Sequence, residues 1–396
     1  MPAGTRLKGD TLKLETYSIL MILYLSSFIL CLLFRYIKQT QSSVKFFCFY
    51  CCFLCLFLCF GYMCGSDWRG YEIMYNRIDL DNLFSDYYAE PGYYIYMLGF
   101  KYLKIDFWIF FIFTKVVVFF IIVKALIKYS DKEKYIAFMY FIPWYGFYLF
   151  IDNPMRNLIA ISIFIFAVKY IVHQKLFIYC GLICLASLFH TSAIIFLPFY
   201  FIANKKIKNF WFVLLFVLFN VFFASKDFLV DFIDYIAGGI PYVSAKLNSY
   251  IVNESIYAEG RLLSFGMIFH ILFFVVLLLK RRNIESYENG IIIFNFAIIY
   301  LLFYRLATTI EIFARFQLYL CVFFCAAIAL LSSMFNLRSK IIYTLYLLLL
   351  AFVGSNRIYA DFRYIPYSNY LEYVIKGYFP SYNERDNYNL KHSPYK

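Results

Sequence analysis

The sequence predicts an all-α fold: a polytopic transmembrane helical bundle of about 12 spans, with sizeable loops on its outer face and an interfacial helix. Composition and patterning predict this fold, because 63% of the 396 residues are apolar, only 15% are charged, and the apolar residues form long unbroken runs. A soluble domain is about 45–50% apolar and about 25% charged. A water-soluble fold of this length would have to expose the excess. A membrane barrel would show short alternating segments instead, so we expect helical spans.

Apolar runs long enough to cross a bilayer recur along the chain. The hydrocarbon core is about 30 Å thick and needs about 20 apolar residues in a helix, with about 17 tolerated. The candidate spans are residues 17–34, 46–64, 107–127, 135–151, 155–172, 209–224, 262–279, 290–304, 312–333 and 341–354. The run 176–203 is apolar over 28 residues. It forms either one long tilted helix or two shorter helices that turn near His190 and Pro198.

Basic residues are concentrated in one set of the connections between these spans. This set carries 17 Lys or Arg and four Asp or Glu, whereas the rest of the chain carries 20 of each, so the whole formal charge of +13 lies on one face. Cytoplasmic loops are enriched in Lys and Arg, and we assign this face to the cytoplasm. The two sets alternate only if 176–203 enters and leaves by the same face as a hairpin. Twelve crossings follow, with both termini outside.

The outer face then holds three sizeable segments, residues 65–106, 225–261 and 355–396. Short outer turns surround residues 152–156, His190 and residues 305–311. Because the longest loops lie on the outer face, we expect the functional site there. We expect the whole chain, residues 1–396, to form one integral membrane domain.

Two ionisable residues at the outer membrane boundary are candidate functional groups. His190 lies in the middle of the apolar run 176–203. An ionisable group within a membrane is a functional candidate, and histidine is suited to proton transfer near neutral pH. Arg156 falls on the first turn of the span 155–172, where a cation opposes the helix dipole. It either snorkels to the interface, pairs with Asp152 or binds an anion.

Glu90 precedes Pro91, which is a helix-start signal for a short aromatic segment over 93–104. This segment is too short to span, so we expect it to lie at the interface. Glu90 is either a carboxylate that favours the helix N-terminus or a carboxylate beside a polar ligand.

Several further arginines lie at the same predicted depth as Arg156. They are Arg305, Arg315 and Arg357. Glu311 and Arg315 have the i,i+4 spacing of an intrahelical ion pair, which is the simpler explanation of that arginine. Arginine presents a planar fork that matches phosphate oxygens. Together with His190, these arginines suggest a diphosphate ligand whose tail lies in the bilayer.

The chain shows no Walker loop, no metal-ligand cluster and no acidic pair facing inward, so nucleotide-driven transport and a nucleotide-sugar donor are not expected. The eleven cysteines lie mostly within apolar runs. We interpret them as small buried hydrophobic residues rather than disulfides or metal ligands.

Four motifs in order along the chain resemble a known family. They are Gly65-x-Asp67-x-x-x-Tyr71-x-x-x-Tyr75, Glu90-Pro91-Gly92-Tyr93, Arg156-Asn157-x-x-Ala160 and Phe189-His190-x-Ser192-Ala193. Their order and spacing resemble the EpsG-like group of Wzy-type O-antigen and polysaccharide polymerases over about residues 65–200. One departure is Asn157, where the family commonly has Gln, so no role is claimed for this residue.

The resemblance implies a membrane glycosyltransferase of the bacterial inner membrane with its active site on the periplasmic side. Such an enzyme joins oligosaccharide repeat units carried on undecaprenyl diphosphate, and the diphosphate departs as a sugar hydroxyl attacks the anomeric carbon. The expected diphosphate-binding residues are Arg156, Arg305, Arg315 and Arg357. The expected base is His190 or a carboxylate, Asp67 or Glu90.

The same resemblance sets the expected partners. They are the lipid-linked oligosaccharide, membrane lipid and a chain-length regulator, with no nucleic acid, no cofactor and no metal. Two other functions stay open. A flippase would show charges along both leaflets and internal repeats, and Lys115 is the main charge of that kind. An O-antigen ligase would use the same diphosphate chemistry.

Overall fold

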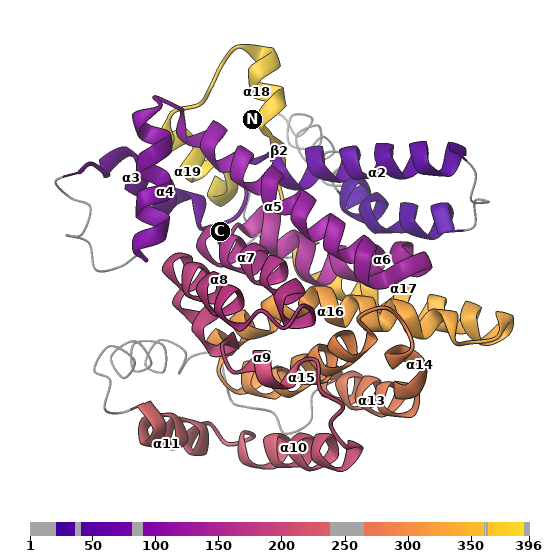
Figure 1. The fold of residues 1–396 in the computed structure, drawn as a ribbon. Coiled ribbons are helices and arrows are strands. Elements are labelled where there is room, and N and C mark those ends of the chain that lie inside the picture. The colour runs from indigo at the N-terminus through magenta and orange to yellow at the C-terminus, as the bar shows by residue number, and fades with distance from the viewer. Residues whose placement is uncertain are drawn as a thin grey trace, which may run out of the picture. The chain divides into compact units, whose positions relative to one another are not determined.

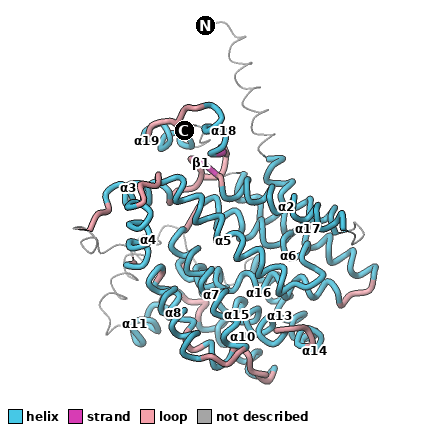
Figure 2. Tube along the Cα trace, turned by 45° about the horizontal axis from the view of Figure 1, so that its top comes forward, coloured by secondary structure: helices cyan, strands magenta, loops and turns pink. Residues whose placement is uncertain are grey.

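Helices make up nearly all of the part of the chain that the structure describes (Figures 1 and 2). This computed structural model describes residues 21–35, 41–80, 90–237, 265–359, 361 and 363–391. Side chains are described within these ranges except at 41–43, 236–237, 265, 311, 357 and 389–391. The first described helix is Met21–Arg35.

The elements that follow it are α2 (Gln41–Cys59), β1 (Gly61–Tyr62), α3 (Trp68–Arg77), α4 (Pro91–Tyr102), α5 (Phe107–Ser130), η1 (Asp131–Glu133), α6 (Lys134–Phe141), η2 (Ile142–Gly146), η3 (Tyr148–Asp152), α7 (Met155–Val172), α8 (Leu176–Phe189), η4 (Thr191–Phe196), α9 (Phe199–Ile202), α10 (Asn209–Phe222), α11 (Lys226–Ala237), α13 (Phe265–Leu279), α14 (Arg281–Glu285), α15 (Gly290–Thr309), η5 (Glu311–Phe313), α16 (Ala314–Ser333), α17 (Leu337–Tyr359), β2 (Ser368–Asn369), α18 (Tyr370–Lys376) and α19 (Tyr382–Lys391). The expected apolar runs therefore appear as helices, with boundaries close to those read from the sequence.

The chain divides into two compact units. The first contains Met1–Ser162, Leu188–His190 and Phe335–Lys396, and the second contains Ile163–Ser187 and Thr191–Met334. Each unit is described here by itself.

Helices α2, α5, α6 and α17 form the core of the first unit. Helix α5 contacts both α2 and α6, and α17 packs against α6 and η2. The approach of α17 depends on Gly354, because a Cβ there would lie 3.0 Å from the Trp144 ring. The chain doubles back after α5. Asp131, the residue after α5, has a positive φ of 51°, and Phe150 of η3 returns to Phe119 of α5, with 5.6 Å between the two rings. The sequence prediction of two separate apolar segments here is confirmed.

A two-stranded antiparallel pair joins residues that are far apart in the sequence. Gly61 of β1 pairs with Asn369 of β2, and Tyr62 pairs with Ser368. The pair holds the C-terminal segment beside the end of α2, so that the tail and the first outer loop belong to the same unit.

Charged residues that the sequence assigns to the basic face meet in the first unit. The Glu133 carboxylate accepts hydrogen bonds from Arg35 at 3.0 Å and from Lys340 at 2.5 Å. In the second unit, Arg281 donates to the carbonyl of Ile207 and to the side chain of Asn209, both at 2.5 Å. Connections between the apolar helices are therefore joined by charged side chains within each unit, and the side of the membrane on which they lie stays a prediction.

The core of the second unit is the pair α15 and α16, whose facing side chains are almost all buried. Helices α10 and α13 pack against α15, and η4 packs against α16. The ambiguous run 176–203 is a hairpin: α8 ends at Phe189, and the Tyr179 hydroxyl donates to the carbonyl of Phe196 at 2.6 Å. The prediction that this run turns back near His190 is confirmed.

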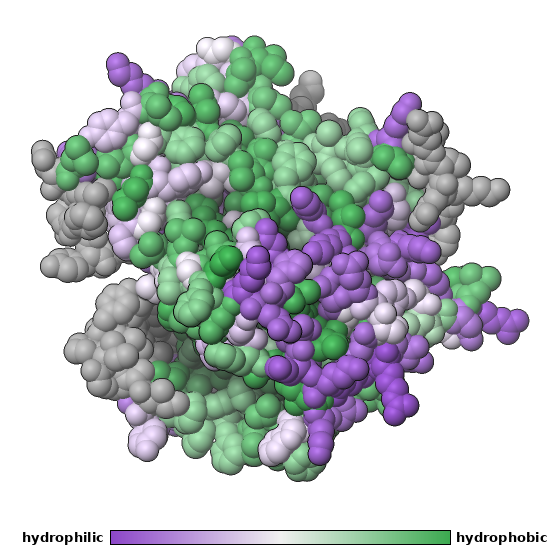
Figure 3. Space-filling view, in the orientation of Figure 1, coloured by the Kyte–Doolittle hydropathy of each residue, from purple (hydrophilic) through white to green (hydrophobic). Residues whose placement is uncertain are grey.

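The protein is an all-α membrane protein, but the structure does not confirm twelve spans. Within the described residues, five helical stretches are long and apolar enough to cross a membrane, or six if the pair Asn209–Phe222 and Lys226–Tyr235, bent by 109°, is one span. Other apolar helices have only 10–17 residues. At about 1.5 Å per residue such helices are shorter than the hydrocarbon core. Apolar side chains cover much of the surface in Figure 3, as expected for contact with lipid.

Candidate functional site

Arg156 and Glu90 form an ion pair in the first unit. Arg156 lies on the first turn of α7, and its Nη1 donates to Oε2 of Glu90 at 2.7 Å. Glu90 is 7% exposed and precedes α4, but its side chain makes no hydrogen bond that caps this helix. The carboxylate is therefore directed to the arginine. The sequence left Asp152 open as the partner of Arg156, and the structure pairs Arg156 with Glu90 instead.

Tyr71 of α3 belongs to the same group of residues, which we call the Arg156 cluster (Tyr71, Glu90 and Arg156). Burial raises the pKa of the Tyr71 hydroxyl, and Arg156 acts against this by lowering the pKa. The ring of Tyr93, from the first turn of α4, lies 5.3 Å from that of Tyr71. Two buried tyrosines therefore lie next to each other at this site, where the Glu90 side chain is 7% exposed and the Arg156 side chain 28% exposed.

A close contact between α4 and the end of α8 brings His190 toward the Arg156 cluster. A Cβ on Gly92 would lie 2.8 Å from the Cβ of Leu188 and 2.9 Å from its carbonyl oxygen, so only glycine allows this approach. Glu90 precedes Gly92 by two residues, and His190 follows Leu188 by two residues. His190 is 7% exposed and lies at the break between α8 and η4. The structure therefore joins the predicted residues Glu90 and Arg156 in an ion pair, and it packs the backbone just before His190 against the first turn of α4.

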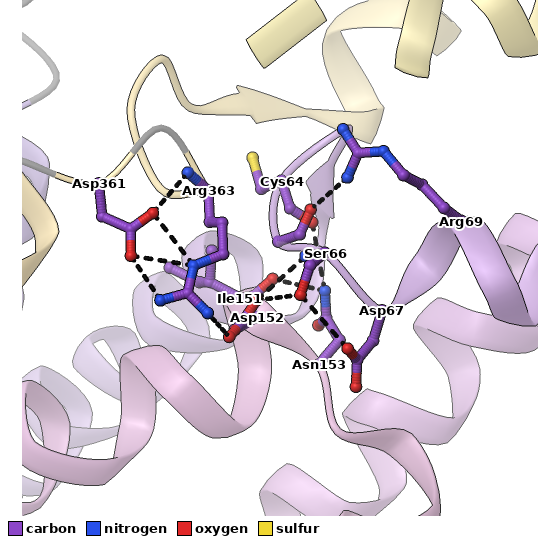
Figure 4. Close-up of polar contacts among 10 residues, drawn as sticks. Cys64, Ser66, Asp67, Arg69, Ile151, Asp152, Asn153, Asp361 and Arg363 are labelled. Carbon is purple, nitrogen blue, oxygen red and sulfur yellow. Dashed lines mark hydrogen bonds and ion pairs between the residues drawn. The ribbon is translucent and has the colours of Figure 1, made fainter. Parts of the chain in front are cut away.

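A second group, the Asp152 cluster (Ser66, Asp152, Asp361 and Arg363), lies in the same unit (Figure 4). Asp152 Oδ2 accepts from Arg363 Nη1 at 2.9 Å, and Asp152 Oδ1 accepts from both the backbone N–H and the hydroxyl of Ser66 at 3.0 Å. Arg363 also donates to both carboxylate oxygens of Asp361. Burial raises the pKa of Asp152, and Arg363 offsets part of this rise.

Gly65 makes the Asp152 cluster possible. Its φ is +80°, and a Cβ there would lie 2.3 Å from the carbonyl oxygen of Ile151. Its backbone N–H donates to the carbonyl of Arg363 at 2.6 Å. Three outer segments that the sequence predicted separately thus meet here: the first loop, the turn at 152 and the C-terminal tail.

Asp67 lies between the two clusters. One of its carboxylate oxygens accepts from the Ser66 hydroxyl at 3.3 Å, and its charge raises the pKa of Tyr71. Its side chain is exposed, unlike those of Glu90 and His190. Asp67 is therefore a carboxylate that solvent and a ligand can reach.

The remaining predicted arginines belong to other helices. Arg305 belongs to α15 and is 2% exposed, and Arg315 belongs to the start of α16, both in the second unit. Arg357 is on α17 in the first unit, and its side chain lies outside the described part. The Glu311 side chain is likewise not described, so the expected pair with Arg315 stays a prediction.

Sequence reasoning missed the pairing of Asp152 with Arg363. These residues are separated by 211 positions, and a single sequence carries no signal for such a contact. All eleven cysteines are free. Among the described residues, no three His, Cys, Asp or Glu side chains are grouped so as to hold a metal ion.

The fold and these clusters define an all-α membrane protein with a polar, arginine-containing site at one end of its first unit. The chain belongs to the EpsG family, whose family model matches residues 44–369. EpsG is a Wzy-like polymerase group, so the resemblance seen in the four motifs is confirmed. The match extends from α2 to β2 and includes both clusters, but not α18 and α19. No curated protein and no solved structure matches the chain.

Proposed function

We propose that the protein polymerises polysaccharide repeat units on the periplasmic side of the bacterial inner membrane. In this reaction a growing glycan is transferred from undecaprenyl diphosphate to a sugar hydroxyl of an incoming lipid-linked repeat unit. Membership of a polysaccharide polymerase family supports this function. The observation that carries the proposal is the Arg156–Glu90 ion pair, together with the close approach of Gly92 to Leu188 two residues before His190, because a positive group and a candidate base then belong to neighbouring segments of the first unit.

Arg156 is proposed to stabilise the departing diphosphate. As the hydroxyl oxygen bonds to the anomeric carbon, the bond from that carbon to the diphosphate oxygen breaks and its electron pair leaves with undecaprenyl diphosphate. Negative charge therefore grows on the phosphate oxygens, and a fixed guanidinium stabilises it most in the transition state. A guanidinium has five N–H donors, so a carboxylate can orient it while it also binds phosphate.

Glu90 is proposed to position Arg156. Its carboxylate is buried and accepts a hydrogen bond from Arg156. Such a charge-assisted bond holds the carboxylate on the guanidinium. We therefore favour His190 as the base that takes the hydroxyl proton, with the exposed carboxylate of Asp67 as the alternative.

Arg305, Arg315 and Arg357 are proposed as further contacts to the diphosphate or to neighbouring sugars. The proposed ligands are an undecaprenyl-diphosphate-linked oligosaccharide and membrane lipid, and a chain-length regulator is the proposed protein partner. Whether the product is O-antigen or capsule depends on the repeat unit, for which these residues give no preference.

The test uses the purified full-length protein in lipid nanodiscs with a defined undecaprenyl-diphosphate-linked repeat unit. We expect a ladder of products that grows one repeat at a time, with release of undecaprenyl diphosphate. Arg156→Ala should slow growth of the ladder by about 10-fold or more, whereas Arg77→Ala, at an exposed arginine of α3, should leave it unchanged. Transfer of the glycan to a different acceptor without chain growth would indicate a ligase, and translocation without any new glycosidic bond would indicate a flippase. Either result would refute the proposal.

A further inference from the structure

Helix α18 exposes an apolar stripe. None of its side chains is buried, although it contains Leu371, Val374 and Ile375. These three residues have the spacing i, i+3 and i+4, which places them on one face of the helix. Tyr378 lies in the turn after the helix, where its hydroxyl donates to the Glu384 carboxylate at 3.3 Å. Ile375 is 85% exposed and Tyr378 is 58% exposed. A short segment therefore presents a continuous apolar surface to its surroundings.

The other sides of α18 are already occupied. Tyr370 and Tyr373 place their rings 5.6 Å and 4.9 Å from the ring of Tyr62, so this side packs against the protein. Glu372 and Lys376 form an i,i+4 ion pair at 2.6 Å on a polar side. The helix thus has a side that packs against the protein, a charged side and an apolar side. Among the described residues, the structure shows a partner for the first two sides, whereas the apolar side is exposed.

The start of α18 is bonded to the end of α2. The backbone N–H of Tyr370 donates to the carbonyl of Phe60 at 2.8 Å, and the Asn369 side chain donates to the carbonyl of Leu56 at 2.9 Å. Helix α2 itself exposes Leu56 (45%) and Phe49 (71%). In a membrane protein, large exposed apolar side chains on such a helix face lipid. These bonds place the start of α18 beside the end of α2 (Figure 1).

We propose that α18 and the turn after it, residues 370–379, dock on the outer leaflet of the membrane. Apolar side chains of an amphipathic helix enter the boundary between headgroups and acyl chains, and tyrosine favours the headgroup level. Continuity with the lipid-facing side of α2 selects lipid over a protein partner. The segment lies outside the family match and the docking does not depend on the reaction assigned to the site.

Two ion pairs of α19 hold the docked segment to the first outer loop. Arg385 binds the Glu72 carboxylate, and both side chains are about 10% exposed. Arg69 binds Asp386 at 2.5 Å. The tail is fixed at β2 and again at α19. Because both ends of the segment between them are fixed, α18 presents the same side to the membrane.

The test places an environment-sensitive fluorescent amino acid at position 375, and in a matched control at position 372, in full-length protein with one molecule per nanodisc. We expect lipids that carry a quenching group near the headgroup to quench the probe at 375 several-fold more than the probe at 372, and aqueous iodide to show the reverse order. Position 375 is so exposed that the probe should not disturb folding.

Equal quenching at both positions, or protection of 375 from both quenchers, would overturn the proposal. Protection that appears only when a second protein copy or another membrane protein is added would also overturn it, because the stripe would then be a protein interface. As a second measurement, Ile375→Glu combined with Val374→Ser should raise iodide access to a probe at 378. No change in that access would likewise count against lipid docking.

Discussion

Gly92 lies against the backbone of Leu188 so closely that a methyl group at position 92 would sit 2.9 Å from the Leu188 carbonyl oxygen. This contact fixes the first turn of α4, which begins after Glu90, against the chain that leads into His190. The geometry of the proposed site therefore depends on a residue that has no side chain.

Gly92→Ala should strongly reduce polymerase activity, because the added Cβ must displace backbone atoms of Leu188 and thereby separate Glu90 from His190. Gly99→Ala is the matched control, since Gly99 lies in the same helix and a Cβ there meets nothing within 4 Å. Product ladders from the two variants, at equal amounts of protein in lipid, check this. Equal activity of the two would show that the Leu188 contact does not position the site.

Arg156→Lys should recover only part of the activity that Arg156→Ala loses. Loss of a charge-assisted contact corresponds to about 1.5–3 kcal/mol, which is about a 10- to 150-fold lower rate. An ammonium restores the charge but not the planar fork. The rate at which each variant releases undecaprenyl diphosphate measures its activity. Full recovery in the lysine variant would contradict a bidentate contact.

Glu90→Gln separates a positioning role from a role as base. If Glu90 only orients Arg156, the glutamine variant should lose less activity than Arg156→Ala, and the double variant should be no worse than Arg156→Ala alone, since the two residues act as a unit. Steady-state rates of the wild-type protein and the three variants give a double-mutant cycle. Additive losses would assign Glu90 an independent role in the reaction.

His190→Ala should lower turnover by about 10²–10⁴-fold if His190 is the general base, while binding of the lipid-linked substrate persists. His190→Gln tests the alternative that this residue only makes hydrogen bonds at the hairpin turn. Turnover and substrate binding are measured separately on the purified variants. Wild-type turnover in the glutamine variant would make Asp67 the better candidate.

Asp152 and Arg363 should be coupled in stability. Arg363→Gln leaves the buried Asp152 carboxylate with its Ser66 hydrogen bonds alone, and Asp152→Asn leaves Arg363 with Asp361 as its ion-pair partner, so each variant should have a lower midpoint of thermal unfolding. The double variant should be less destabilised than the sum of the two, with a coupling energy of about 0.5–3 kcal/mol. Thermal unfolding in detergent gives the three values, and strict additivity would mean that the pair adds nothing to the fold.

The helices could be predicted because a helix that crosses the hydrocarbon core needs a run of about 20 apolar residues, which is visible in the sequence. The apolar run over residues 155–172 has the same bounds as α7. The number of spans could not be predicted in the same way. Apolar composition does not distinguish a helix that crosses the membrane from a shorter one that turns back, and α8 is an example.

The site was predicted in part. Motif residues such as Glu90, Arg156 and His190 were recognisable because polar groups are rare in apolar surroundings. Their partners were not, since Arg156 has Asp152 four residues before it but binds Glu90, 66 residues earlier. Pairing across such distances depends on how the helices pack, which a single sequence does not specify.

The contact between Asp152 and Arg363 also sets an order of assembly during synthesis. Translation proceeds from the N-terminus, so Ser66 and Asp152 enter the membrane well before Arg363, which is 211 residues after Asp152. Until the last helix has been inserted, the early part of the first unit has a carboxylate without its arginine and a strand, β1, without β2. The nascent protein therefore completes the Asp152 cluster only after Arg363 has left the ribosome, and a chain released before that point lacks the cluster.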